Sequence, residues 1–93
     1  KVNDVIKHQL AKAATSVGAN YEESQGAFSK EDFKFKISIC FKEARESNYW
    51  LRIIKAVNIS TDNKLDVLIG ESLELKKIFA SIMKKLNDKE KDK

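Results

Sequence analysis

The 93-residue sequence has no proline, only three glycines, one cysteine and one histidine. A many-stranded sandwich or barrel needs many turn-forming residues, so the scarcity of proline and glycine favours long helices. One cysteine excludes an internal disulfide and a cysteine-rich zinc site, and one histidine excludes multi-histidine metal motifs. We therefore predict no metal and no cofactor.

Long hydrophobic runs are also missing. No apolar run approaches the roughly 20 residues of a membrane span, and no secretory signal opens the chain. We expect a cytoplasmic protein with no membrane partner. Hydrophobic residues make up 42% of the chain, which is too many for a disordered protein. We expect one helical domain over residues 1–87 and a charged flexible tail over 88–93.

The apolar residues recur at helical spacing in three segments. The first helix should run to about Gly26, where a left-handed glycine can end it, and its apolar stripe is Val2, Ile6, Leu10, Ala13, Val17 and Tyr21. Ser29 and Asp32 resemble a capping box and predict a second helix over about 30–57. A polar loop over 58–63 precedes a third helix over about 63–87. The heptad stripe of this helix is Leu65, Leu68, Ser72, Leu75, Phe79, Ile82 and Leu86.

Short connections between long helices make consecutive helices antiparallel neighbours. The predicted fold class is therefore all-α, a left-handed up-and-down bundle. The second helix carries three stripes at heptad spacing. The first is uncharged and should face the core: Phe33, Ile37, Cys40, Ala44, Ser47, Leu51 and Ile54.

The second stripe of this helix is basic. It contains four cations and no acid, namely Lys34, Arg45, Arg52 and Lys55, and Lys42 lies beside it. Residues 29–57 hold seven cations and four acids, a net charge of +3, so most of the chain's net +4 lies here. Such a face is either simply solvated or contacts phosphates. We take these five residues as the candidate nucleic-acid-binding set.

The third stripe turns apolar in its second half, at Trp50, Ile53 and Val57. An outer helix of a finished monomer needs only one apolar stripe. Either another helix of the chain or another subunit should cover these three residues, because an exposed apolar patch usually marks an interface. We take them as a candidate oligomer interface.

A polar line on the first helix indicates a structural cluster. Ser16, Asn20 and Glu23 share one face, continuous with the core side. A buried Asn20 needs hydrogen-bond partners, for which Lys36, Glu43 and Glu46 of the second helix are candidates. These six residues should form a polar cluster that fixes the helix register, since polar groups in bundle cores sometimes do so.

No catalytic constellation emerges. His8 has no neighbouring nucleophile with an orienting third group, and Cys40 lies in the core stripe, where cysteine acts as a small hydrophobe. Glu71 and Glu74 could be mistaken for a di-metal site, but the required Glu-x-x-His partners are absent. We predict that the protein is not an enzyme.

Two sequence motifs resemble those of a bacterial four-helix-bundle family whose founders are encoded in intervening sequences of large-subunit ribosomal RNA genes. They are QLAKAATSVGANYEE over residues 9–23 and EARESNYWL over 43–51, and the likeness covers most of residues 6–86. The resemblance implies a left-handed bundle, homopentamers in several members, and one more helix at the amino end. Because Lys1 opens directly into a helical pattern, we expect the natural chain to have residues upstream. A similar protein, the accessory variability determinant of diversity-generating retroelements, binds nucleic acid and a reverse transcriptase.

Two functional hypotheses follow. The first is a non-enzymatic homo-oligomer that binds RNA or DNA through the basic face of the second helix, largely without sequence specificity, because no base-reading module or stacking platform is evident. The second is an interaction scaffold whose apolar stripe recruits a protein partner, with the charge serving solubility alone.

Overall fold

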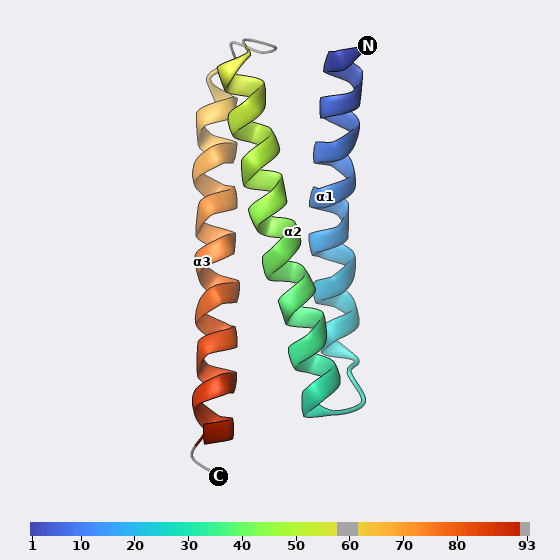
Figure 1. The fold of residues 1–93 in the computed structure, drawn as a ribbon, viewed down its shortest axis with the longest axis vertical. Coiled ribbons are helices and arrows are strands. Elements are labelled where there is room, and N and C mark those ends of the chain that lie inside the picture. Colours follow the sequence, from blue (N-terminus) through green and yellow to red (C-terminus); the bar gives the residue numbers. More distant parts are fainter. Residues whose placement is uncertain (58–61, 92–93) are drawn as a thin grey trace.

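Three antiparallel helices make up the fold (Figure 1). The structure is a computed structural model that describes residues 1–57 and 62–91. In these ranges it contains α1 (Val2–Gln25), α2 (Lys30–Ala56) and α3 (Lys64–Lys91), and no strand. The predicted all-α class is confirmed, and the first two helices end within a residue or so of the expected positions.

The start of α2 is capped as the sequence predicts. The Asp32 amide donates to Ser29 Oγ at 3.0 Å, and the Phe28 amide donates to Asp32 Oδ2 at 3.3 Å. In a capping box the carboxylate would accept from the amide of the N-cap residue, Ser29. Here Asp32 accepts from Phe28, the residue before Ser29, so the two bonds form a variant of the capping box. The end of α1 differs from the prediction, because Gly26 has φ −104° and is not left-handed. Its amide closes the helix by donating to Glu23 O at 3.2 Å.

The carboxyl end of α3 is longer than expected. Residues 88–91, predicted as part of a flexible tail, continue the helix to Lys91. An ion pair of 2.9 Å between Lys34 Nζ and Glu90 Oε2 joins this end to the start of α2. The last two residues of the expected tail, and residues 58–61 of the expected polar loop, lie outside the described residues.

Helix α2 lies between α1 and α3 and packs on both (Figure 1). Its uncharged stripe faces the core as predicted. Two apolar clusters form along it: one contains Ile6, Leu51, Ile54 and Leu65, and the other Ile37, Cys40, Ala44 and Phe79. Buried Ser47 and Asn48 lie between the clusters, so a polar layer divides the core.

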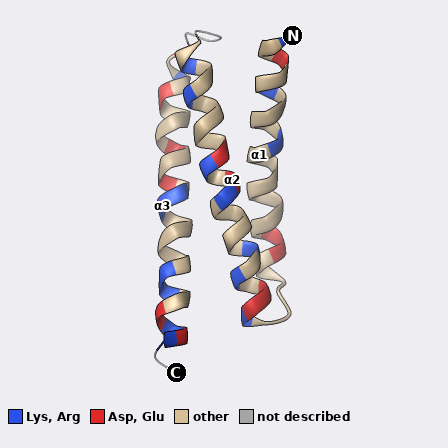
Figure 2. Cartoon of the chain, viewed as in Figure 1, with Lys and Arg blue, Asp and Glu red and all other residues tan. Residues whose placement is uncertain are grey.

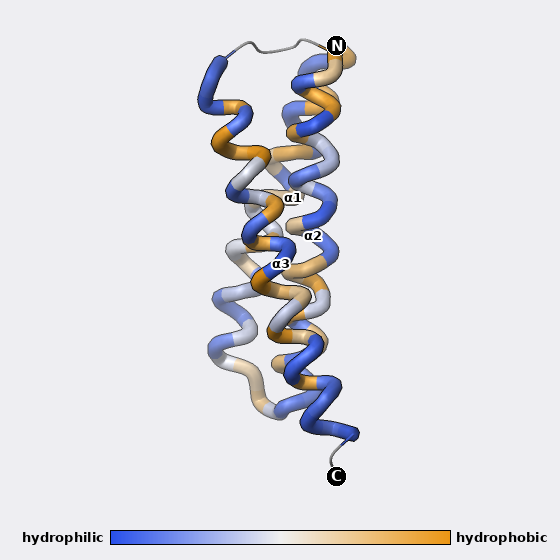
Figure 3. The backbone as a smooth tube through the Cα atoms, turned by 90° about the vertical axis from the view of Figure 1, so that its left-hand side faces the viewer, coloured by the Kyte–Doolittle hydropathy of each residue, from blue (hydrophilic) through white to orange (hydrophobic). Residues whose placement is uncertain are grey.

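Helices α1 and α3 each pack on α2 and leave a groove between them. In the described chain their backbones do not meet, although the rings of Tyr21 and Phe79 approach to 6.4 Å between centroids. The apolar stripes of both helices are therefore only partly buried. Leu68 and Leu75, predicted to face the core, are 47% and 42% exposed. Figure 3 shows hydrophobic positions recurring along α3.

Candidate nucleic-acid interface

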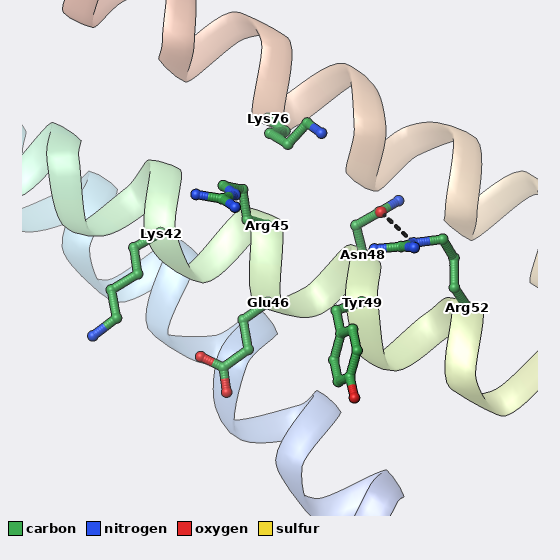
Figure 4. Close-up of a pocket in the computed structure, with 7 residues that line it drawn as sticks. All are labelled: Lys42, Arg45, Glu46, Asn48, Tyr49, Arg52 and Lys76. Carbon is green, nitrogen blue, oxygen red and sulfur yellow. Dashed lines mark hydrogen bonds between the residues drawn. The ribbon is translucent and has the colours of Figure 1, made fainter.

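A basic pocket lies where the middle of α2 meets α3 (Figure 4). Its volume is about 400 Å³, and it is lined by Lys42, Arg45, Glu46, Asn48, Tyr49 and Arg52 of α2 and by Lys76 of α3. Four cations and one acid give the lining a formal charge of +3. Figure 2 shows the basic positions of α2 beside a basic segment of α3. A pocket of this charge favours an anion.

The floor of the pocket is the buried amide of Asn48, which is 6% exposed. Asn48 Nδ2 donates to Ser72 Oγ at 2.9 Å and to Ile69 O at 3.3 Å, so this side chain joins α2 to α3. Because α2 and α3 are antiparallel, the residues one turn before Asn48 on α2 lie opposite the residues one turn after Ser72 on α3. The Asn48–Ser72 contact therefore places Lys76 opposite the segment of α2 that carries Arg45 (Figure 4).

Each arginine of the pocket is held by a neutral neighbour. Arg52 Nε donates to Asn48 Oδ1 at 2.9 Å, which orients the guanidinium and leaves its two terminal amino groups for a ligand. The Arg45 guanidinium lies 5.8 Å from the centroid of the Phe41 ring, within the range of a cation–π contact. Among the described residues no carboxylate pairs with Lys42, Arg45, Arg52 or Lys76. Their charges are available to an incoming anion.

Two members of the predicted basic set are paired instead. Lys34 pairs with Glu90, and Lys55 Nζ lies 2.7 Å from Asp66 Oδ1. Both acids belong to α3, which packs beside these lysines, and the sequence gives no spacing rule for contacts between helices. Exposed ion pairs contribute little stability and exchange readily, so the pairing weakens the positive field at these positions without removing it.

The predicted polar cluster is divided in the structure. Asn20 Nδ2 donates to Ser16 O at 2.9 Å and to Ser16 Oγ at 3.1 Å, so its bonds remain within α1. The expectation that Asn20 bonds to Lys36, Glu43 or Glu46 is wrong, because an acceptor one turn away satisfies the amide. The link between α1 and α2 within this set is the ion pair of Lys36 with Glu23 at 3.7 Å. Glu46 Oε1 instead accepts a bond from Trp50 Nε1 within α2 at 3.3 Å.

The buried polar residue that links α2 to α3 is Asn48, which the sequence placed on the basic stripe. One feature of the sequence indicates that Asn48 is buried. The heptad stripe of α3 contains a serine, Ser72, among apolar residues. A buried hydroxyl needs a partner, and the only way to locate that partner is to know the α2–α3 register.

The apolar stripe at the end of α2 is partly covered within the chain. Trp50 and Ile53 are half-buried against the cluster that contains Ile6 and Leu51, whereas Val57 is 54% exposed. An interface between subunits through these three residues stays a prediction.

The cysteine and histidine lie outside the pocket. Cys40 is fully buried, and burial raises the pKa of its thiol, while a hydrogen bond from the Cys40 backbone partly opposes this rise. His8 is exposed on α1. The described residues contain no group of three metal-ligating side chains, and no described helix is long and apolar enough to cross a membrane.

Comparison with known proteins assigns the family. Residues 2–81 match the family described as 23S rRNA-intervening sequence protein. The chain belongs to this family. The resemblance seen in the two sequence motifs is thereby confirmed.

A solved structure is similar over most of the chain. It is a crystal structure of a protein of unknown function from the S23 ribosomal protein family of Bacteroides thetaiotaomicron. The two sequences are 35% identical, the TM-score is 0.81, and the alignment covers 86% of this chain and 74% of the other. No protein of curated function matches the sequence. Neither the matched family nor the similar structure is described as an enzyme, and the family description refers to an intervening sequence of 23S rRNA.

Proposed function

We propose that this protein binds the phosphate backbone of RNA or DNA through the basic pocket of α2 and α3, without catalysing a reaction. The observation that carries the proposal is the group of four cations, Lys42, Arg45, Arg52 and Lys76, with no carboxylate partner in the described chain. Cations that release condensed counterions from nucleic acid supply most of the free energy of backbone binding. Lys34 and Lys55 extend the positive surface along α2.

The central arginines are suited to this role. A guanidinium presents several donors in a planar fork that matches two phosphate oxygens. Arg45 and Arg52 are seven residues apart, which is about 10 Å along a helix, so the two can contact different phosphates of one strand. Lys76 adds charge from the neighbouring helix. Contacts of arginine and lysine to phosphate carry no sequence information, so binding should depend weakly on base sequence.

The test is a filter-binding titration of labelled RNA at two ionic strengths. The double change Arg45→Glu and Arg52→Glu should weaken binding by at least roughly tenfold at low salt. The slope of log K against log salt should fall by about two, because two phosphate contacts are lost. An RNA affinity that changes neither with salt concentration nor with this double change would exclude the proposal.

A matched control separates the pocket from general charge. Lys7 and Lys12 are exposed on α1, outside the pocket, and their double change to Glu alters the net charge by the same amount. This variant should retain most of the affinity. An equal loss in both double variants would assign the binding to overall charge and not to the pocket.

A second candidate function is an oligomeric scaffold, which the groove between α1 and α3 favours. The groove has a volume of about 440 Å³ and a mainly apolar lining that includes Leu10, Val17, Leu51, Leu68 and Leu75. The family resemblance implies a left-handed bundle with a fourth helix, and homopentamers in several members. A fourth helix or a helix of another subunit would pack against this groove. The solution mass, measured together with the ratio of nucleic-acid to protein absorbance before and after nuclease treatment, distinguishes a self-assembling scaffold from a nucleic-acid binder.

A further inference from the structure

An exposed tyrosine stands among the cations of the basic pocket. Tyr49 is 47% exposed and lines the pocket together with Arg45 and Arg52 (Figure 4). The geometry points to a site for an unpaired nucleotide segment, in which a base stacks on the Tyr49 ring while the arginines hold the flanking phosphates. This inference rests on the proposed function and specifies its ligand as single-stranded nucleic acid.

The spacing along α2 supports this arrangement. Lys42, Arg45, Tyr49 and Arg52 follow one another at intervals of three, four and three residues, which places them on one face of the helix. The backbone position of Tyr49 therefore lies between those of Arg45 and Arg52, which are about 10 Å apart along the helix axis. Sites for single-stranded nucleic acid combine these two elements, a positive groove for the backbone and an aromatic surface for the bases.

The ring of Tyr49 is also held in place. It meets the Trp50 ring edge-on, with centroids 5.0 Å apart and an interplanar angle of 70°. The Trp50 indole is itself held by its bond to Glu46. The single acid of the pocket thus acts as an acceptor for Trp50, and a fixed aromatic ring loses little conformational freedom when a base stacks on it.

A paired strand fits this site less well than an unpaired one. The bases of a duplex are stacked on one another and present only their edges, whereas an unpaired base exposes a face that an aromatic side chain can cover. Electrostatic contacts serve both kinds of strand, since both carry phosphates. The preference for unpaired segments must therefore depend on the ring and not on the arginines.

The experiment measures fluorescence anisotropy of labelled oligouridylate and oligothymidylate of about 12 nucleotides, beside a duplex RNA of the same length, at one fixed salt concentration. Tyr49→Leu should weaken binding of both single strands by roughly tenfold and leave duplex affinity within about twofold. Tyr49→Phe keeps the ring and should retain the wild-type affinities. Tyr49→Gln provides a second variant without a ring, and circular dichroism checks that each variant is folded.

Phe28→Leu is the matched control, because Phe28 is a fully exposed aromatic residue outside the pocket and should be silent. If Tyr49→Leu and Tyr49→Gln bind single strands as the wild type does, or lose duplex binding equally, the stacking site is excluded. In that case an effect of the arginine changes would still support backbone binding. If the arginine changes also have no effect, the proposed function itself fails.

Discussion

At the scale of single residues, Asn48 connects the core to the surface. Its amide nitrogen bonds to Ser72 and Ile69 of α3, and its oxygen accepts from Arg52. One side chain thus fixes the register of two helices and orients a cation of the candidate site. Buried polar groups are costly without partners, and the described chain has no buried side-chain nitrogen or oxygen that lacks one.

Asn48→Ala should therefore lower the free energy of unfolding by about 2 kcal/mol, since it removes a buried bond between helices and leaves a small cavity. Urea denaturation followed by circular dichroism measures the change. The control is Asn20→Ala, where the lost bonds lie within α1. The higher helix propensity of alanine offsets that loss, so the control should stay within about 0.5 kcal/mol of the wild type. Equal losses in the two variants would contradict the assigned role of Asn48.

At the scale of elements, the starts of α2 and α3 are set by contacts within a few residues of the chain. The Ser29 cap uses a hydroxyl and a carboxylate three residues apart, and both partners lie within a single turn. The Asp62 carboxylate likewise accepts from the Lys64 amide at 2.9 Å at the start of α3. The far end of α3 lies four residues beyond the predicted end, and its Glu90 pairs with Lys34, a residue distant in sequence.

Ser29→Ala should cost about 1 kcal/mol of folding free energy, because the first turn of α2 loses an acceptor for an amide. Thermal and urea unfolding report the loss. Ser38 offers a matched control: its hydroxyl bonds to Phe35 O within α2, where alanine is the better helix former. Ser38→Ala should be neutral or slightly stabilising, and a loss as large as that of Ser29→Ala would argue against a capping effect.

At the scale of the whole molecule, the described chain is long and thin, with extents of 50 × 20 × 17 Å. Its radius of gyration is 15.2 Å, whereas a compact domain of this length is expected near about 12 Å. Two of the three helices contact only α2 through their backbones, so much apolar side-chain surface remains exposed. A surface of this kind is typical of a protein that associates with another helix.

If the groove between α1 and α3 packs against a second copy, Leu68→Gln with Leu75→Gln should weaken self-association by roughly tenfold or more, because burying each leucine contributes about 1.5–3 kcal/mol. Light scattering across a concentration series measures the mass. Val2 and Val5 are exposed apolar residues outside the groove, and their double change to Gln serves as the control. Unchanged mass in the leucine variant would rule out the groove as the interface.

The sequence by itself determined the helices, the uncharged stripe of α2 and the concentration of positive charge on that helix. These features depend on residues three or four positions apart, whose contacts follow from the helical period. Only the tertiary structure decided which cations are paired with acids, that Asn48 and not Asn20 links two helices, and that Lys76 and Tyr49 complete the basic pocket. Those outcomes depend on the register between helices, which is set by packing of residues far apart in the chain and has no periodic signature in the sequence.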